Sequence, residues 1–348
     1  MSKADAAAAI LWVGVTFYAL FGGADFGGGL WDLIAGDAEK GERPRDLIQS
    51  SLTPVWEANH VWLIFVLVVL WTAFSAAFSA IFSTLYVPIA LAAVGIVLRG
   101  AGFAFRKQIE GLQARRAAGA TFALSSVLTP FFMGVVVGAV ASGEVPADGN
   151  GDAFSTWLQP LPLLTGVLFV ATSAYLAAVF LVGDARRAGD PDLERYFVRR
   201  SLAAAAVAGI GAAVGLVELH AEARYVFDRL VDQGLPLVIA SAACGLGLLA
   251  LLLRPMGRKV DSGSTYRPIG GRFLRPLAAG AVVSVIWGWG VAQWPYLLPT
   301  SMRIDEAAAP DSTLIMVFVV FAAAAVFVLP SLALLYALSQ RDLLEHEH

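Results

Sequence analysis

Nine apolar stretches follow one another along the chain, and this succession limits the fold more than any other feature. A helix rises about 1.5 Å per residue, so about 20 apolar residues cross a hydrocarbon core of roughly 30 Å. The sequence therefore predicts an all-α, polytopic membrane helical bundle in a single membrane domain, residues 1–348, arranged as two four-helix bundles plus one helix. The predicted spans are residues 7–34, 54–74, 78–99, 119–141, 159–182, 200–218, 234–254, 272–296 and 312–338.

Composition excludes a water-soluble protein. The chain is 58% hydrophobic and 15% charged, with a mean hydropathy of +0.72, whereas soluble domains are about one quarter charged. The net charge of -3 and the absence of a basic run argue against a nucleic-acid partner. The first apolar stretch has no small-residue cleavage site after it, so we expect it to be retained.

The distribution of Lys and Arg predicts the orientation in the membrane. These residues concentrate in the connections after the first, third, fifth and seventh spans, and loops rich in them stay in the cytoplasm. The connection at 141–156 has three acidic residues and no Lys or Arg, as expected of an external loop. We therefore expect the N-terminus outside and the C-terminus in the cytoplasm.

Charged and polar residues inside predicted spans are costly and mark candidate functional positions. Asp25 lies in the run Gly22–Gly29, whose five glycines let neighbouring backbones approach. We expect Asp25 to face inward with a partner. The alternative is a packing helix whose Asp bonds to Ser or backbone groups.

The second span begins with a dense set of polar and aromatic residues. Glu57 and His60 are three residues apart, on one face of a helix, and His titrates near neutral pH, so the pair could pass protons. A Glu-x-x-His pair also occurs in di-iron bundles, but a second copy is absent here. Arg99, at the inner edge of the third span, could pair with Asp25 or Glu57. For Arg106, the simpler interpretation is that its positive charge anchors the span at the cytoplasmic face. In the predicted orientation these groups share the cytoplasmic half, where they would form a proton inlet.

Few residues could serve as haem ligands within the membrane. The candidates are His60, His220, Met133 and Cys244. So small a set argues against a multi-haem chain, and the single cysteine excludes a Cys cluster for a metal.

Three segments resemble subunit II of the cytochrome bd-type quinol oxidases. The segment 22–29 resembles the family's first helix signature, and Trp56-Glu57-Ala58-Asn59-His60-Val61-Trp62-Leu63 resembles its Trp-Asp-Gly-Asn-x-Val-Trp-Leu motif. The third is Leu98-Arg99, Gly102-Phe103 and Arg106. Gly22, Glu57 and Ala104 depart from the usual pattern, which suggests a divergent, cyanide-insensitive-like branch.

The resemblance implies a haem-free subunit that supports a larger subunit I, which carries haems b and d and the quinol site and reduces oxygen to water. It implies a multi-pass protein of the bacterial cytoplasmic membrane, in contact with lipid, and allows small accessory subunits and a quinone bound in this chain. Trp62 would lie near a route for oxygen. The candidates for the proton pathway or quinone region are Asp25, Trp56, Glu57, Asn59, His60, Arg99 and Arg106.

Two other functions are compatible with the residues. In a proton-coupled secondary transporter, Asp25 and Glu57 would bind the coupling ion, but matching broken helices in two halves would be expected and only the glycine run qualifies. An assembly factor without transport activity is the third hypothesis.

Overall fold

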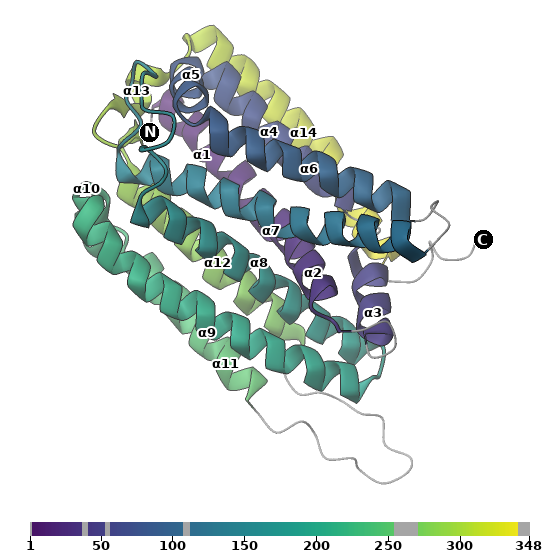
Figure 1. Ribbon diagram of the computed structural model, residues 1–348. Coiled ribbons are helices and arrows are strands. Elements are labelled where there is room, and N and C mark those ends of the chain that lie inside the picture. The colour runs from purple at the N-terminus through teal and green to yellow at the C-terminus, as the bar shows by residue number, and fades with distance from the viewer. Residues whose placement is uncertain (1, 37–40, 53–55, 107–111, 254–270, 340–348) are drawn as a thin grey trace.

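The computed structural model describes residues 2–36, 41–52, 56–106, 112–253 and 271–339 (Figure 1). These residues form a helical bundle with one small hairpin. The helices are α1 (Lys3–Phe17), the π-helical turn η1 (Tyr18–Gly22), α2 (Gly23–Leu33), α3 (Glu42–Leu52), α4 (Trp56–Ala73), α5 (Ser75–Thr84), α6 (Tyr86–Arg106), α7 (Leu112–Ser142), α8 (Pro160–Arg187), α9 (Pro191–Glu222), α10 (Arg224–Asp232), α11 (Leu235–Leu252), α12 (Gly271–Gln293), α13 (Ile304–Ala307) and α14 (Asp311–Ser339). The strands are β1 (Tyr296–Leu298) and β2 (Met302–Arg303).

Each predicted span overlaps a helix, and the prediction of a polytopic helical membrane bundle is confirmed. Among the described residues, seven helical segments are long and apolar enough to cross a membrane, and α4 with α5 would count as an eighth, broken span. The described apolar part of α6, Tyr86–Gly102, is shorter. The orientation across the membrane stays a prediction.

The chain turns sharply between α4 and α5, where the boundaries differ from those predicted. The two helices meet at 116°, because Phe74 leaves the helical conformation with φ -140° and ψ 53°. Residues 78–84, predicted to begin the third span, belong to α5 instead. Phe74 and Leu85, at the two ends of α5, are fully buried. Packing of these side chains fixes the breaks, and the only Pro or Gly close to either of them is Pro88, in the first turn of α6.

Local signals explain where several helices begin and end. Ser2 and Asp5 form a reciprocal capping box at the start of α1. Gly189, with φ 67°, follows the last turn of α8, a position that glycine occupies without strain. Asp190 accepts hydrogen bonds from two backbone N–H groups of the next helix, and Pro191 occupies its first turn. α9 therefore begins nine residues before the predicted boundary at 200.

Several elements lie outside the predicted spans. α3 follows the first span, α10 follows α9, and the β1–β2 hairpin with α13 joins α12 to α14. The hairpin is antiparallel and pairs Tyr296 with Arg303 and Leu298 with Met302. α12 ends at Gln293, because residues 296–298 enter the hairpin instead of extending the span.

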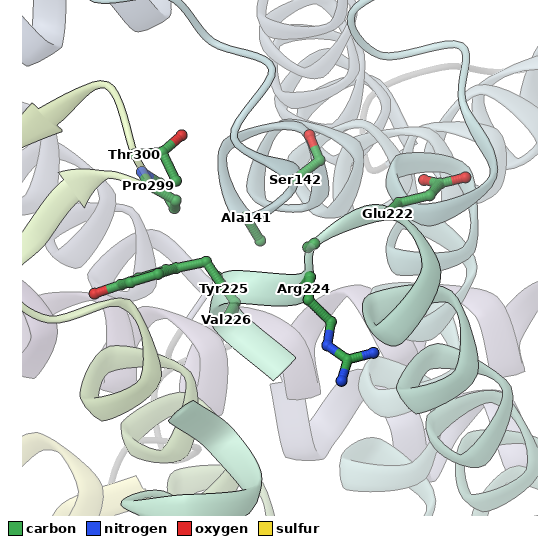
Figure 2. A pocket seen from close by; sticks show the side chains of 9 residues that line it. Ala141, Ser142, Glu222, Arg224, Tyr225, Val226, Pro299 and Thr300 are labelled. Carbon is green, nitrogen blue, oxygen red and sulfur yellow. The ribbon is translucent and has the colours of Figure 1, made fainter. Parts of the chain in front are cut away.

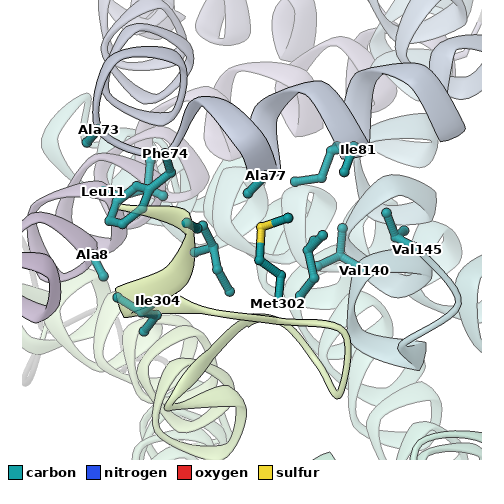
Figure 3. Packing of buried hydrophobic residues seen from close by; sticks show 14 of the residues in the cluster. Ala8, Leu11, Ala73, Phe74, Ala77, Ile81, Val140, Val145, Met302 and Ile304 are labelled. Carbon is teal, nitrogen blue, oxygen red and sulfur yellow. The ribbon is translucent and has the colours of Figure 1, made fainter. Parts of the chain in front are cut away.

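The helices pack as two groups joined into one body (Figure 1). α1–α2 with α4, α6 and α7 form the first group, α8, α9, α11 and α12 form the second, and α14 lies against α1 and α4. α8 contacts both α2 and α7, so the groups share an interface. One buried cluster joins α1, α4, α5 and α7 to the hairpin around Phe74 and Met302 (Figure 3). A second joins α2 to α8, α9, α11 and α12.

The connections predicted for the two sides of the membrane gather at opposite ends of the bundle. At one end, Arg43 of α3 pairs with Asp190 between α8 and α9, and Arg275 of α12 pairs with Asp184 of α8. At the other end, Lys3 pairs with Asp311. Figure 1 shows α3 at the first of these ends, and α5, α10 and α13 at the other. This separation matches the alternation of basic and acidic loops in the sequence.

Candidate functional site

A buried ion pair joins the glycine-rich helix α2 to α6. Arg99 Nη2 lies 2.7 Å from Asp25 Oδ1 and donates a second hydrogen bond, of 3.0 Å, to the Asp25 carbonyl oxygen. Asp25 is 2% exposed and Arg99 1% exposed. Opposite charges in such a place neutralise one another, which makes both tolerable at membrane depth. The prediction that Arg99 pairs with Asp25 or Glu57 is confirmed for Asp25.

The rest of the Arg99 guanidinium contacts a hydroxyl and two aromatic rings. Nη1 donates to Ser126 Oγ of α7, and the guanidinium carbon lies 5.0 Å from the Phe26 ring centre and 4.5 Å from that of Phe122. Gly29 makes room for this arrangement, because a Cβ there would lie 2.9 Å from Arg99 Nη1 and closer still to Ser126. Three helices, α2, α6 and α7, therefore close around one cation.

The helix that carries Asp25 widens one turn before it. Residues Tyr18–Gly22 form a π-helical turn between α1 and α2, a feature that occurs often at functional sites. Asn59 of α4, which is buried, donates a hydrogen bond of 3.3 Å to the carbonyl oxygen of Phe21 in that turn. The predicted candidate Asn59 thus holds the wide turn against the start of the second span.

Two further titratable side chains lie beside the ion pair. Tyr18 and His60 each interact electrostatically with Asp25 and Arg99. The Tyr18 hydroxyl and Asp25 Oδ2 are both buried, and neither forms a hydrogen bond to the described residues. His60 is half-buried. Predicted residues from the first, second and third spans, Asp25, His60 and Arg99, therefore come together.

Trp62 lies three residues after Asn59 in α4, in a row of aromatic rings. It is 8% exposed and stacks on Phe17 at 4.4 Å between ring centres. Phe21 continues the row on one side of Phe17, and Phe65 meets Trp62 edge-on at 6.2 Å on the other. Trp62 therefore belongs to an apolar layer that adjoins the polar cluster.

Three predicted candidates fall outside what the structure describes in detail. The backbone places Trp56 and Glu57 in the first turn of α4, and Arg106 at the end of α6. Their side chains lie outside the described residues, so their predicted roles stay predictions.

Sequence reasoning missed Tyr18 and Ser126 as members of the cluster. Tyr18 precedes Asp25 by seven residues, a spacing that repeats on one face of a helix. The wide turn of η1 changes that phase, which weakens the signal. Ser126 is one of two adjacent serines in an apolar stretch of α7, and such residues often form hydrogen bonds between membrane helices. Searching that stretch for a hydroxyl would have found it.

A separate pocket of about 130 Å³ opens at the other end of the bundle (Figure 2). Ser142, Glu222, Tyr225 and Thr300 are among its lining residues. Glu222 Oε2 accepts a hydrogen bond of 3.1 Å from the backbone N–H of Leu161, at the start of α8. The carboxylate of Glu222, the one acidic side chain that the described part of the chain contributes to this pocket, is therefore engaged in capping a helix. No group of three or more His, Cys, Asp or Glu side chains among the described residues could hold a metal ion.

Comparison with known proteins identifies the family. The sequence model described as cytochrome bd terminal oxidase subunit II matches residues 4–339. The chain belongs to this family. It is therefore part of a cytochrome bd quinol oxidase complex, an oxidoreductase, and family membership implies a partner subunit I that carries haems.

Relatives of the subunit II family extend over most of the chain. The putative cytochrome bd menaquinol oxidase subunit II of Bacillus subtilis is 19% identical and aligns with 97% of this chain and 95% of its own. The cytochrome bd-I ubiquinol oxidase subunit 2 of Escherichia coli K12 is 24% identical over 83% of this chain and 80% of its own. A chain in the structure of bd oxidase from Geobacillus thermodenitrificans has a TM-score of 0.78 at 23% identity, covering 97% of this chain and 98% of that one, which shows the same fold.

Proposed function

We propose that this chain is the haem-free subunit II of a cytochrome bd-type terminal oxidase, in which quinol oxidation is coupled to the reduction of oxygen to water. The observation that carries the proposal is the family match over residues 4–339. The match favours an oxidase subunit over the transporter and assembly-factor hypotheses. The relatives' names include both menaquinol and ubiquinol oxidases, so the proposed substrate is a quinol without further distinction.

The surroundings of three of the four candidate haem ligands support a haem-free chain. Haem iron needs an axial ligand such as His, Met or Cys with room for the macrocycle beside it. The sulfur of Cys244 in α11 faces α12, where a Cβ on Gly280 would come within 3.1 Å of it. His220 is exposed and contacts Arg224 at the end of α9. His60 lies against the Asp25–Arg99 cluster. Haems b and d therefore belong to subunit I in this proposal.

A visible spectrum tests the haem assignment. The complex would be purified through a tag on this chain, and the reduced-minus-oxidised difference spectrum recorded with the co-purifying bands identified by mass spectrometry. We expect b- and d-type haem bands that accompany a larger subunit and are lost when this chain is separated from it. Haem that stays with the separated chain would refute the haem-free assignment, and a colourless preparation with no partner would refute the oxidase function.

We also propose that Tyr18, His60 and Asp25 contribute to proton access from the cytoplasmic side. Arg99 holds the Asp25 carboxylate in place, and the second oxygen of that carboxylate is left without a hydrogen bond from the described residues. A phenol and an imidazole beside it supply groups that can take and release protons. Charged groups inside membrane proteins commonly serve such relays. Glu57 would extend the path toward the start of α4.

The proton proposal is tested by variants that leave the ion pair intact. His60→Gln and Tyr18→Phe remove titratable groups while keeping similar side-chain volumes, and Glu57→Gln does the same at the helix start. We expect slower turnover and a displaced pH profile of quinol oxidation, together with slower proton uptake in proteoliposomes. His220→Gln, at the exposed end of α9, serves as the control. Turnover and pH profiles that match the control in every variant would overturn the proposal.

Trp62 is proposed to border a hydrophobic route for oxygen. Oxygen is small and apolar, and the aromatic row of Phe21, Phe17, Trp62 and Phe65 offers a continuous apolar layer toward α14. This layer adjoins the polar cluster without entering it. In this role Trp62 affects access of oxygen to the partner and leaves the chemical step unchanged.

A further inference from the structure

Arg200 marks the point where α9 enters its apolar stretch. Charged residues are frequent in the first turns of this helix, and Arg200 is the last of them before residues 201–217, which carry no charge. Little of the apolar part of α9 is covered by the rest of the described chain. Arg200 therefore lies at the level where a membrane helix passes from the headgroup layer into the hydrocarbon.

Aromatic rings hold the guanidinium in place. Its carbon lies 3.3 Å from the Tyr196 ring centre and 5.8 Å from that of Trp31, at the end of α2. Nη1 makes a long hydrogen bond of 3.5 Å to the Tyr196 carbonyl oxygen, and Nε is buried without a hydrogen bond to the described residues. The side chain is thus half-buried and fixed, with donors still available.

Among the described residues, the other half-buried arginines at this end of the bundle have carboxylate partners. Arg186 pairs with Glu194 at 2.7 Å, Arg275 with Asp184 at 2.7 Å, and Arg45 with Asp32 at 3.5 Å. Arg200 has no carboxylate partner within the described part of the chain. A guanidinium held by aromatic rings at a membrane boundary, with its charge uncompensated, calls for an anion from outside the chain.

A second cation and a hydroxyl point to the same place. The Tyr196 hydroxyl is buried and interacts electrostatically with both Arg200 and Arg45. Arg200 therefore faces a phenol and the Trp31 ring, and the phenol also interacts with Arg45, which has its own partner Asp32. One net positive charge remains among them. Two guanidinium groups and a phenol hydroxyl are suitable donors for a tetrahedral oxyanion.

We infer that Arg200, Tyr196 and Arg45 bind the phosphate of an anionic phospholipid in the leaflet that faces the α3 end of the bundle. The arginine forks donate to the phosphate oxygens, the phenol supplies a third donor, and the acyl chains extend along the uncovered apolar surface of α9. Basic pockets between membrane helices bind lipid headgroups in this way. We infer a lipid because the site opens at the edge of an apolar stretch. The acyl chains of a lipid would cover that apolar surface, whereas a soluble phosphate has none to cover it.

Native mass spectrometry of the intact oxidase complex tests this inference. The complex, purified through a tag on this chain, would be exchanged into phosphatidylcholine nanodiscs containing about one third phosphatidylglycerol, and the retained phosphatidylglycerol counted after release. Arg200→Gln and Tyr196→Phe would be compared with Arg199→Gln, an exposed neighbour of the same charge. One arginine contact to an anionic headgroup predicts about a fivefold loss of lipid occupancy in Arg200→Gln. Tyr196→Phe should lose less, and Arg199→Gln should match the unmodified complex.

Three other outcomes would overturn the inference. Equal lipid retention in Arg200→Gln and Arg199→Gln would show that Arg200 does not bind lipid. Loss of subunit I from Arg200→Gln, with no change in lipid retained by the remaining complex, would assign a carboxylate of the partner to Arg200. If inorganic phosphate raised the melting temperature of the complex in pure phosphatidylcholine as much as phosphatidylglycerol does, the site would bind free phosphate instead. Should Arg200→Gln fail to assemble, Tyr196→Phe and the melting-temperature comparison of the unmodified complex decide the question.

Discussion

Neutralising one member of the Asp25–Arg99 pair should destabilise the complex far more than neutralising an exposed pair. The two side chains are 3% and 2% exposed, so water cannot replace a lost partner. Removing one charge from a buried pair costs about 3–5 kcal/mol, since the other charge remains in an apolar medium. For a chain of this size, that cost corresponds to a fall in melting temperature on the order of 5 °C. Asp25→Asn is therefore expected to melt about that much lower.

The matched control is the exposed pair between Lys3 and Asp311. Its side chains are 47% and 72% exposed, and such pairs contribute about 0–1 kcal/mol. Asp311→Asn should therefore leave the melting temperature nearly unchanged. The assay is thermal denaturation of the purified complex in detergent, followed by tryptophan fluorescence and by the haem absorbance of the partner at a fixed scan rate.

A double variant separates loss of the pair from loss of its charge balance. Asp25→Asn combined with Arg99→Gln leaves no uncompensated charge, so we expect it to recover much of the loss, with a coupling energy of about 2–3 kcal/mol. The reasoning would be refuted if Asp25→Asn melted with the unmodified complex. It would also be refuted if the double variant lost the sum of the two single effects, because the two residues would then act independently.

Three further variants test other parts of the structure. Gly27→Ala places a methyl group against the backbone carbonyl of Ser173 and should cost about 1–3 kcal/mol; thermal melting should show no such loss for Gly209→Ala, whose methyl group would meet nothing within 4 Å. The pKa of Asp190 lies below its usual value because its carboxylate accepts backbone hydrogen bonds at the start of α9. Its charge therefore stabilises the fold above the usual pKa of an Asp and ceases to do so as pH falls through the lowered value, so the melting-temperature gap between Asp190→Asn and the unmodified complex should close below about pH 4; a gap independent of pH would contradict this. Trp62→Phe should change the apparent KM for oxygen while turnover at saturating oxygen stays constant, and an unchanged KM measured with an oxygen electrode would count against the proposed route.

Hydrophobicity predicted the fold because the backbone N–H and C=O groups of each span must form their hydrogen bonds within a helix. The length and apolar character of a segment therefore suffice to locate a span. The breaks around α5 escaped prediction, because burial of Phe74 and Leu85 sets them and burial depends on the completed fold. α10 and the β1–β2 hairpin were missed for a related reason. They lie in connections where the membrane imposes no periodicity on the sequence.

The candidate site was predictable where a residue carries a charge whose free-energy cost inside a membrane span is high. Asp25 and Arg99 are expensive alone, so the sequence itself indicated that they should have partners. The contributions of Ser126 and Phe122 were not predictable in this way, since Ser and Phe have little free-energy cost in a membrane helix. Only packing shows which Ser and Phe residues contact the guanidinium. The π-helical turn was missed because no residue pattern distinguishes it from the α-helix on either side.

That wide turn allows one membrane span to pack against two different pairs of helices. In an unbroken α-helix, each residue advances the side-chain direction by about 100°, so the face chosen by the first half determines the face of the second. A turn that holds more residues shifts this phase once, at Tyr18–Gly22. α1 can then present its small residues to α4 and α14, while α2 independently directs its glycines toward α7 and α8. The shift sets the rotation of α2 about its axis relative to α1. We expect that deletion of a single residue from this turn would rotate Asp25 away from Arg99.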